Sequence, residues 1–119
     1  MASDKKILSE AASLAVSTKD NRTFLLGAIG QRADGVFVFS RNIAAPDATL
    51  SRLNHAEARL SRKLTPGSTV WVARVSRLDG SWAMAKPCKA CEVRLRGAGV
   101  SRIVYTIGPS EWGVIACES

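Results

Sequence analysis

Acidic residues are scarce relative to basic ones in this 119-residue chain. Ten Asp and Glu stand against 17 Lys and Arg, so the formal net charge is +7 with the single histidine neutral. A positive excess favours association with polyanions, although it carries no information about the fold. The 46% hydrophobic fraction excludes a disordered chain, which would lack the apolar residues for a core. The length predicts one domain over residues 1–119.

Long apolar runs are missing as well. The chain contains nothing near the roughly 18 consecutive apolar residues that a membrane span needs, and residues 1–6 lack the apolar core of a signal peptide. Cysteine is rare and odd in number, at three, which argues against a disulfide framework. We therefore expect a cytoplasmic protein without a membrane partner, in which closely spaced cysteines bind metal or take part in redox chemistry.

Hydrophobic patterning predicts an α/β fold. Apolar residues at three- and four-residue spacing predict helices over 3–17 and 48–64, and Pro87 with the glycines at 97 and 99 delimits a third helix over 87–96. Short apolar runs predict five strands, over 23–29, 36–39, 69–75, 102–107 and 114–117. The Asp34-Gly35 turn predicts an antiparallel hairpin of the first two strands, and the loop after Gly108 predicts a second one at the C-terminal end. Strands that alternate with helices imply a mixed sheet covered by helices.

Two short motifs carry residues suited to zinc chemistry. The first is His55-Ala56-Glu57 and the second is Pro87-Cys88-Lys89-Ala90-Cys91. Cys88 and Cys91 are three residues apart, so they share a helix face, and the positive end of the helix dipole stabilises thiolates in the first turn. Zinc prefers nitrogen and sulfur ligands, and a catalytic zinc keeps one position for water. The pattern predicts a zinc site of His55, Cys88 and Cys91, with Glu57 placed to take a proton from the water.

Together the motifs form the pattern His-x-Glu followed by Pro-Cys-x-x-Cys, the signature of zinc nucleobase deaminases. Over roughly residues 23–117, both the motifs and the order of elements resemble the cytidine deaminase-like superfamily. The resemblance implies a three-layer α/β/α sandwich around a mixed five-stranded sheet. It also implies a Zn²⁺-dependent hydrolase that replaces an exocyclic amine with oxygen, in which His55, Cys88 and Cys91 ligate the metal and Glu57 shuttles protons.

The resemblance also suggests substrate contacts. Asn42, at the end of the second strand, matches an Asn that many members use near the substrate sugar, but it could equally be a turn residue. Trp82 precedes the Pro87 turn, where nucleic-acid cytosine deaminases place an aromatic wall of the base pocket; packing in the core or on the surface is the alternative. We further expect the backbone at Ala56 and the turn at Pro87 to hold the base.

The sequence is compatible with several classes of substrate. A histidine as first ligand resembles deoxycytidylate, nucleic-acid and tRNA adenosine deaminases, whereas the C-terminal hairpin resembles free-nucleoside and toxin-type deaminases. We expect conversion of cytosine to uracil in a (deoxy)cytidine nucleoside or nucleotide, or in single-stranded nucleic acid. One alternative is a deaminase restricted to single-stranded DNA or RNA, or to tRNA adenosine.

A second alternative is a nucleic-acid-binding module with a structural zinc. Such a site would want a fourth ligand, for which Cys117 is the remaining cysteine; otherwise Cys117 is a small core residue. Assembly is common in the superfamily, which suggests a homo-oligomer without fixing its symmetry.

Basic residues gather on the two helices that carry the motifs. They are Arg52, Arg59, Arg62 and Lys63 on the first helix, and Lys86, Lys89, Arg94 and Arg96 on or beside the second. These side chains form either a solvated helix face or a track of phosphate contacts that leads to the pocket.

Overall fold

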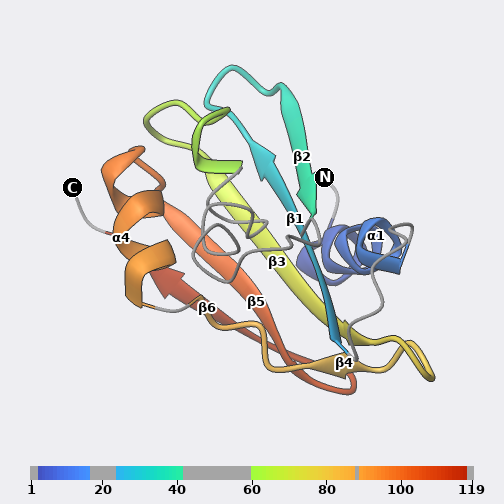
Figure 1. The fold of residues 1–119 in the computed structure, drawn as a ribbon. Coiled ribbons are helices and arrows are strands. Elements are labelled where there is room, and N and C mark those ends of the chain that lie inside the picture. Colours follow the sequence, from blue (N-terminus) through green and yellow to red (C-terminus); the bar gives the residue numbers. More distant parts are fainter. Residues whose placement is uncertain (1–2, 17–23, 42–59, 88, 118–119) are drawn as a thin grey trace, which may run out of the picture.

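The computed structural model describes residues 3–16, 24–41, 60–87 and 89–117. Their helices and strands are, in chain order, α1 (Asp4–Val16), β1 (Phe24–Gln31), β2 (Phe37–Arg41), β3 (Thr69–Ser76), β4 (Trp82–Ala83), α4 (Lys89–Gly97), β5 (Arg102–Gly108) and β6 (Glu111–Ala116) (Figure 1). Within these ranges no helix is long and apolar enough to span a bilayer.

The strands form one mixed sheet in the order β2-β1-β3-β5-β6. Strand β1 pairs antiparallel with β2 and β3, β3 pairs parallel with β5, and β5 pairs antiparallel with β6. Both predicted hairpins and the mixed five-strand path are therefore confirmed. The sequence did not predict β4, a sixth strand of two residues that pairs with β3. The last strand also begins earlier than expected, at Glu111 instead of residue 114.

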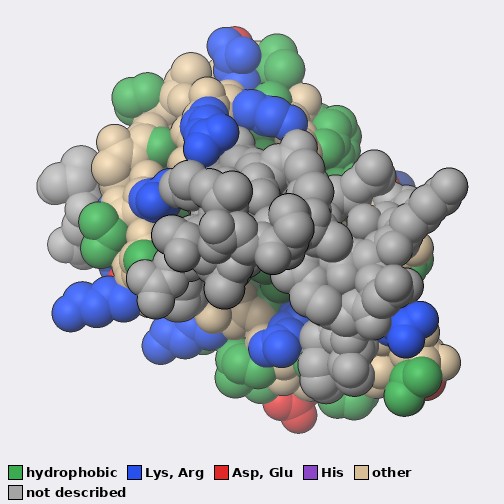
Figure 2. Space-filling model, in the orientation of Figure 1, with side chains coloured by type: hydrophobic (Ala, Val, Ile, Leu, Met, Phe, Trp, Pro, Cys, Tyr) green, Lys and Arg blue, Asp and Glu red, His purple; other side chains and the backbone are tan. Residues whose placement is uncertain are grey.

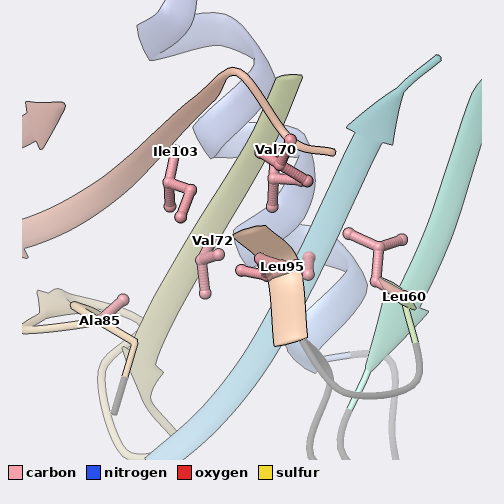
Figure 3. Packing of buried hydrophobic residues seen from close by; sticks show 8 residues of the cluster. Leu60, Val70, Val72, Ala85, Leu95 and Ile103 are labelled. Carbon is pink, nitrogen blue, oxygen red and sulfur yellow. The ribbon is translucent and has the colours of Figure 1, made fainter. Parts of the chain in front are cut away.

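Helices cover both faces of the sheet because the side chains of β3 alternate between two apolar clusters. Val70 and Val72 belong to a cluster with Leu60 and with Leu95 of α4. The neighbouring Trp71 and Ala73 point to the other face, in a cluster that contains Leu8 and Ala11 of α1. Figure 3 shows Leu60 and Leu95 on the same side of the sheet as Val70 and Val72, with α1 behind the strands. The predicted three-layer α/β/α arrangement is confirmed.

Helix α1 is attached to the sheet through its first turn and its middle. Ser3 caps the helix, since its Oγ accepts a hydrogen bond from the Lys6 amide at 3.2 Å. The Asp4 carboxylate accepts a hydrogen bond from the indole nitrogen of Trp71 at 2.9 Å and pairs with Arg102. Gly27 of β1 allows close approach, because a Cβ there would lie 2.1 Å from the carbonyl oxygen of Ala11.

Backbone hydrogen bonds join the loop that precedes β3 to the loop between α4 and β5, and these two are called the locked loops below. The Gly67 amide donates to the Gly99 carbonyl at 2.8 Å, and the Ser101 amide donates to the Ser68 carbonyl at 2.8 Å. Gly99 has a φ of +88°, and a Cβ on it would lie 2.6 Å from the Cα of Pro66. The glycine after α4 thus ends the helix, as predicted, and lets the two loops touch.

The predicted helix over 48–64 falls largely outside the described residues. Residues 60 and 61 are helical, a turn follows at 62 and 63, and the Lys63 amide donates to the Leu60 carbonyl at 2.8 Å. The helix thus ends about three residues before the predicted position. Leu60 is fully buried against the α4 side of the sheet, so the segment that leads into β3 lies in the same layer as α4.

Candidate active site at the carboxyl end of the central strands

One edge of β3 pairs with β1, and its other edge is divided between two partner strands. Residues Thr69 to Val72 pair with β5, whereas Arg74 and Val75 pair with β4. The parallel strands β3 and β5 therefore separate at their carboxyl ends, and β4 lies between them there. In open α/β sheets, ligand sites form outside the carboxyl ends of strands that separate in this way.

A turn brings the chain from β3 back to its own edge. The Ser76 amide donates to the Ser81 carbonyl at 2.9 Å, while Asp79 accepts hydrogen bonds from the Ser81 amide at 2.9 Å and hydroxyl at 2.7 Å. These hydrogen bonds from Ser81 lower the pKa of the exposed Asp79 carboxyl. The turn needs the carboxylate form as acceptor, so these hydrogen bonds stabilise it at pH values above the pKa of Asp79 and are lost as the pH falls through that pKa.

Thr106 of β5 fixes the segment that leads to the cysteine motif. Its hydroxyl accepts a hydrogen bond from the Arg74 amide at 3.1 Å and donates one to the Ala83 carbonyl at 2.7 Å. Its carbonyl accepts a further bond from the Ala85 amide at 2.8 Å. The Thr106 side chain is fully buried. Its hydrogen bonds join β3, β4 and β5 and hold the segment that leads to Pro87. Nothing in the sequence distinguishes Thr106 from other strand threonines, and sequence reasoning missed it.

The second motif lies where α4 begins. Pro87 is buried and Cys91 is the third residue of α4, with 3% of its surface exposed. Cys91 thus lies in the first turn, where unpaired backbone amides and the helix dipole favour a thiolate. The helix begins at Lys89, two residues later than predicted.

Five predicted site residues fall outside the described residues: Asn42, His55, Ala56, Glu57 and Cys88. Two of them adjoin described elements in the chain. Asn42 directly follows the last residue of β2, and Cys88 directly precedes the first residue of α4. The contacts of all five remain predictions.

Trp82 packs on the α1 side of the sheet. It pairs with Val75, whose side chain belongs to the cluster with Ala15 of α1, and Trp82 packs against that same cluster. Paired residues share a face of the sheet, so the indole lies on the α1 side, opposite α4. The two-residue strand β4 fixes which way the Trp82 side chain points, and a contact between Trp82 and the base stays a prediction.

Cys117 lies at the opposite end of α4 from Cys91. Its amide donates to the Ser101 carbonyl at 2.9 Å, and it lines a pocket with Arg96, in the last turn of α4. Five residues of helix separate Arg96 from Cys91, a rise of about 7.5 Å, whereas two thiolates on one zinc both bind at about 2.3 Å. Cys117 packs half-buried at the edge of the core, which disfavours it as a fourth ligand beside Cys91.

Solved cytidine deaminases share this fold. The chain superimposes on a cytidine deaminase from Burkholderia pseudomallei with a TM-score of 0.64 and 21% identity, over 93% of this chain and 91% of that one. It superimposes on a mutant cytidine deaminase from Mycobacterium tuberculosis with a TM-score of 0.55 and 22% identity, over 91% of each chain. The chain has the cytidine deaminase fold. No family model matches the sequence, and no curated protein matches it.

The residues of the two motifs supply donor atoms that suit zinc. Among the described residues no three His, Cys, Asp or Glu side chains form a metal-binding group, since three of the four motif residues lie outside them. Of the four motif residues the structure describes one, Cys91, in the first turn of α4 at the carboxyl end of the sheet. Two thiolates and an imidazole are a donor set that zinc favours, with a fourth position left for water. The donor chemistry therefore fits a catalytic zinc.

Proposed function

We propose that this protein is a zinc-dependent hydrolytic deaminase that converts cytosine to uracil in a nucleoside, a nucleotide or a single-stranded nucleic acid. One observation carries the proposal: in a chain with the cytidine deaminase fold, Pro87 and Cys91 of the Pro-Cys-x-x-Cys motif lie where the central strands separate. The reaction adds the oxygen of water to C4 of cytosine and releases the amine as ammonia.

In the proposed mechanism His55, Cys88 and Cys91 hold the metal. Zinc in such a site lowers the pKa of a bound water towards about 7. Glu57 accepts one proton from the water and delivers it to the ring nitrogen of the base as the hydroxide oxygen adds to C4. Glu57 then takes the second proton from the hydroxyl group on C4 and passes it to the amine, which leaves as ammonia while the C4 carbonyl forms. A carboxylate suits these transfers because it can accept and return a proton within one turnover. Asn42 and the backbone at Ala56 and Pro87 are proposed to hold the substrate.

The placement of Cys117 favours this proposal over a binding module with a structural zinc. A structural site is commonly closed by four protein ligands, and the third cysteine packs near the last turn of α4 instead. A deaminase restricted to tRNA adenosine shares the same ligand pattern, and the choice of base distinguishes it.

Comparison of the wild type with two cysteine variants tests the function. Purified wild-type protein should contain one zinc per chain and release ammonia from cytidine or a cytosine-containing strand. Cys91→Ala should lose both zinc and activity. Cys117→Ala, the matched control, should keep both. A wild-type protein that holds one zinc and deaminates adenosine but not cytosine would refute the choice of base. A Cys117→Ala protein without zinc would refute the ligand set.

A further inference from the structure

Basic side chains are concentrated on the face of the sheet that α4 covers. Described residues of three kinds contribute: those on or next to α4, those after the helical residues 60 and 61, and one on β3. They are Arg62, Lys63, Arg74, Lys86, Lys89, Arg94 and Arg96. Arg74 belongs here because it continues the alternation of Val70 and Val72. Figure 2 shows Lys and Arg side chains spread around this face, with few Asp or Glu among them.

Few described carboxylates balance these charges. Glu92 of α4 pairs with Arg96 at 3.6 Å, and Glu111 lies at the margin, where β6 begins. The opposite layer differs, since the first turn of α1 holds Asp4 beside Lys5 and Lys6, and Asp4 pairs with Arg102 across to the sheet. The excess positive charge of the described chain is therefore concentrated on the layer that carries the cysteine motif.

The basic residues also extend along α4. Lys86 and Lys89 flank Cys88, whereas Arg96 lies in the last turn, next to the locked loops at Gly99. From Lys89 to Arg96 the helix rises about 10 Å, which is longer than one phosphate group. Arg62 and Lys63 continue the charge beyond α4, and Lys63 is held in place through a 2.6 Å hydrogen bond to the Phe39 carbonyl.

We propose that the α4 face binds the phosphate backbone of a single-stranded nucleic acid and that the proposed site deaminates such a strand in preference to a free nucleoside. The proposal rests on the deaminase function for its catalytic part, but its binding part can be tested alone. A nucleoside has no charge to meet these cations, and a single nucleotide reaches only those beside Cys88. A strand places successive phosphates along the whole face, where each contact releases counterions.

The experiment uses a strand without cytosine, so that binding does not depend on deamination. Fluorescence anisotropy measures the affinity for labelled oligothymidylate between 50 and 200 mM salt. Contact with about four phosphates gives a log–log slope near −2.8, and binding then weakens about 50-fold over this range. Arg62→Gln/Arg94→Gln, which removes two exposed cations outside the cysteine motif, should lower the slope to about −1.4.

Lys5→Gln/Lys6→Gln is the matched control, because it removes the same charge from exposed positions on α1. It should bind like wild type. Equal weakening by both double variants would overturn the proposal, since net charge and not the α4 face would then govern binding. Affinity that does not change with salt would overturn it too.

Activity separates this proposal from the proposed function. Arg62→Gln/Arg94→Gln should deaminate cytidine with an unchanged kcat/KM and a cytosine-containing strand with a kcat/KM at least about 10-fold lower. A wild type that deaminates cytidine and deoxycytidylate but binds no strand would overturn the α4-face proposal and leave the deaminase standing. Strand binding without deamination of any cytosine substrate would overturn the proposed function together with the substrate part of this proposal, and only strand binding by the α4 face would stand.

Discussion

Thr106→Val provides a direct test of how the candidate site is held. The change replaces a hydroxyl with a methyl group and nearly conserves the volume of a fully buried side chain. It leaves the Arg74 amide and the Ala83 carbonyl without the partner that now lies 3.1 Å from the one and 2.7 Å from the other. Each buried polar group that loses its partner costs about 1–3 kcal/mol. Arg74 and Ala83 already face each other as a strand pair, so partial relaxation favours the lower end.

We therefore expect Thr106→Val to reduce the free energy of unfolding by about 2 kcal/mol in urea titrations, with an unchanged m-value. Thr106→Ser keeps the hydroxyl and loses one methyl group, which costs about 1 kcal/mol. The valine variant should also lose activity, because Ala83 and Ala85 position the turn at Pro87, whereas the serine variant should retain it. A valine variant at least as stable as the serine variant would show that the hydroxyl does not hold these strands.

Three further changes test the proton shuttle and the packing of α1. Glu57→Gln should keep zinc and stability and lose deamination by about 10²-fold or more; near-normal turnover would exclude Glu57 as the shuttle, and loss of zinc would make it a ligand. Gly27→Ala should be strongly destabilising in thermal unfolding, because its Cβ meets the α1 backbone at 2.1 Å, whereas Gly108→Ala, with open space around it, should change stability little; equal melting temperatures would contradict this packing. Asp4→Ala should cost about 1–2 kcal/mol in urea unfolding, and an unaffected midpoint would mean that its bonds to Trp71 and Arg102 contribute nothing.

Sequence reasoning predicted the long elements and the chemistry of the motifs but not the details that position them. The five main strands were predictable because each is long enough to show either an alternation of apolar and polar residues or a continuous apolar run. Strand β4 was not, since two residues define no period, and its side-chain orientation decided where Trp82 packs. The role of Thr106 depends on a contact with Ala83, 23 residues away, and no local pattern encodes a contact of that kind. The proposed zinc ligands rest on motif spacing alone, and three of the four motif residues lie outside the described chain.

The locked loops where β3 and β5 begin have a consequence for engineering. Gly67, Gly99 and the bond between Ser68 and Ser101 join two α-to-β connections at the end of the sheet remote from Cys91. Substitution of either glycine should lower the yield of soluble protein, because a Cβ on Gly99 would lie 2.6 Å from the Cα of Pro66 and Gly67 has a φ of +87°. Met84 and Lys86, between β4 and α4, are exposed and take no part in these loop contacts. A library that seeks a new base preference should therefore vary Met84 and Lys86 and leave Pro87, Cys88 and the glycine loops untouched.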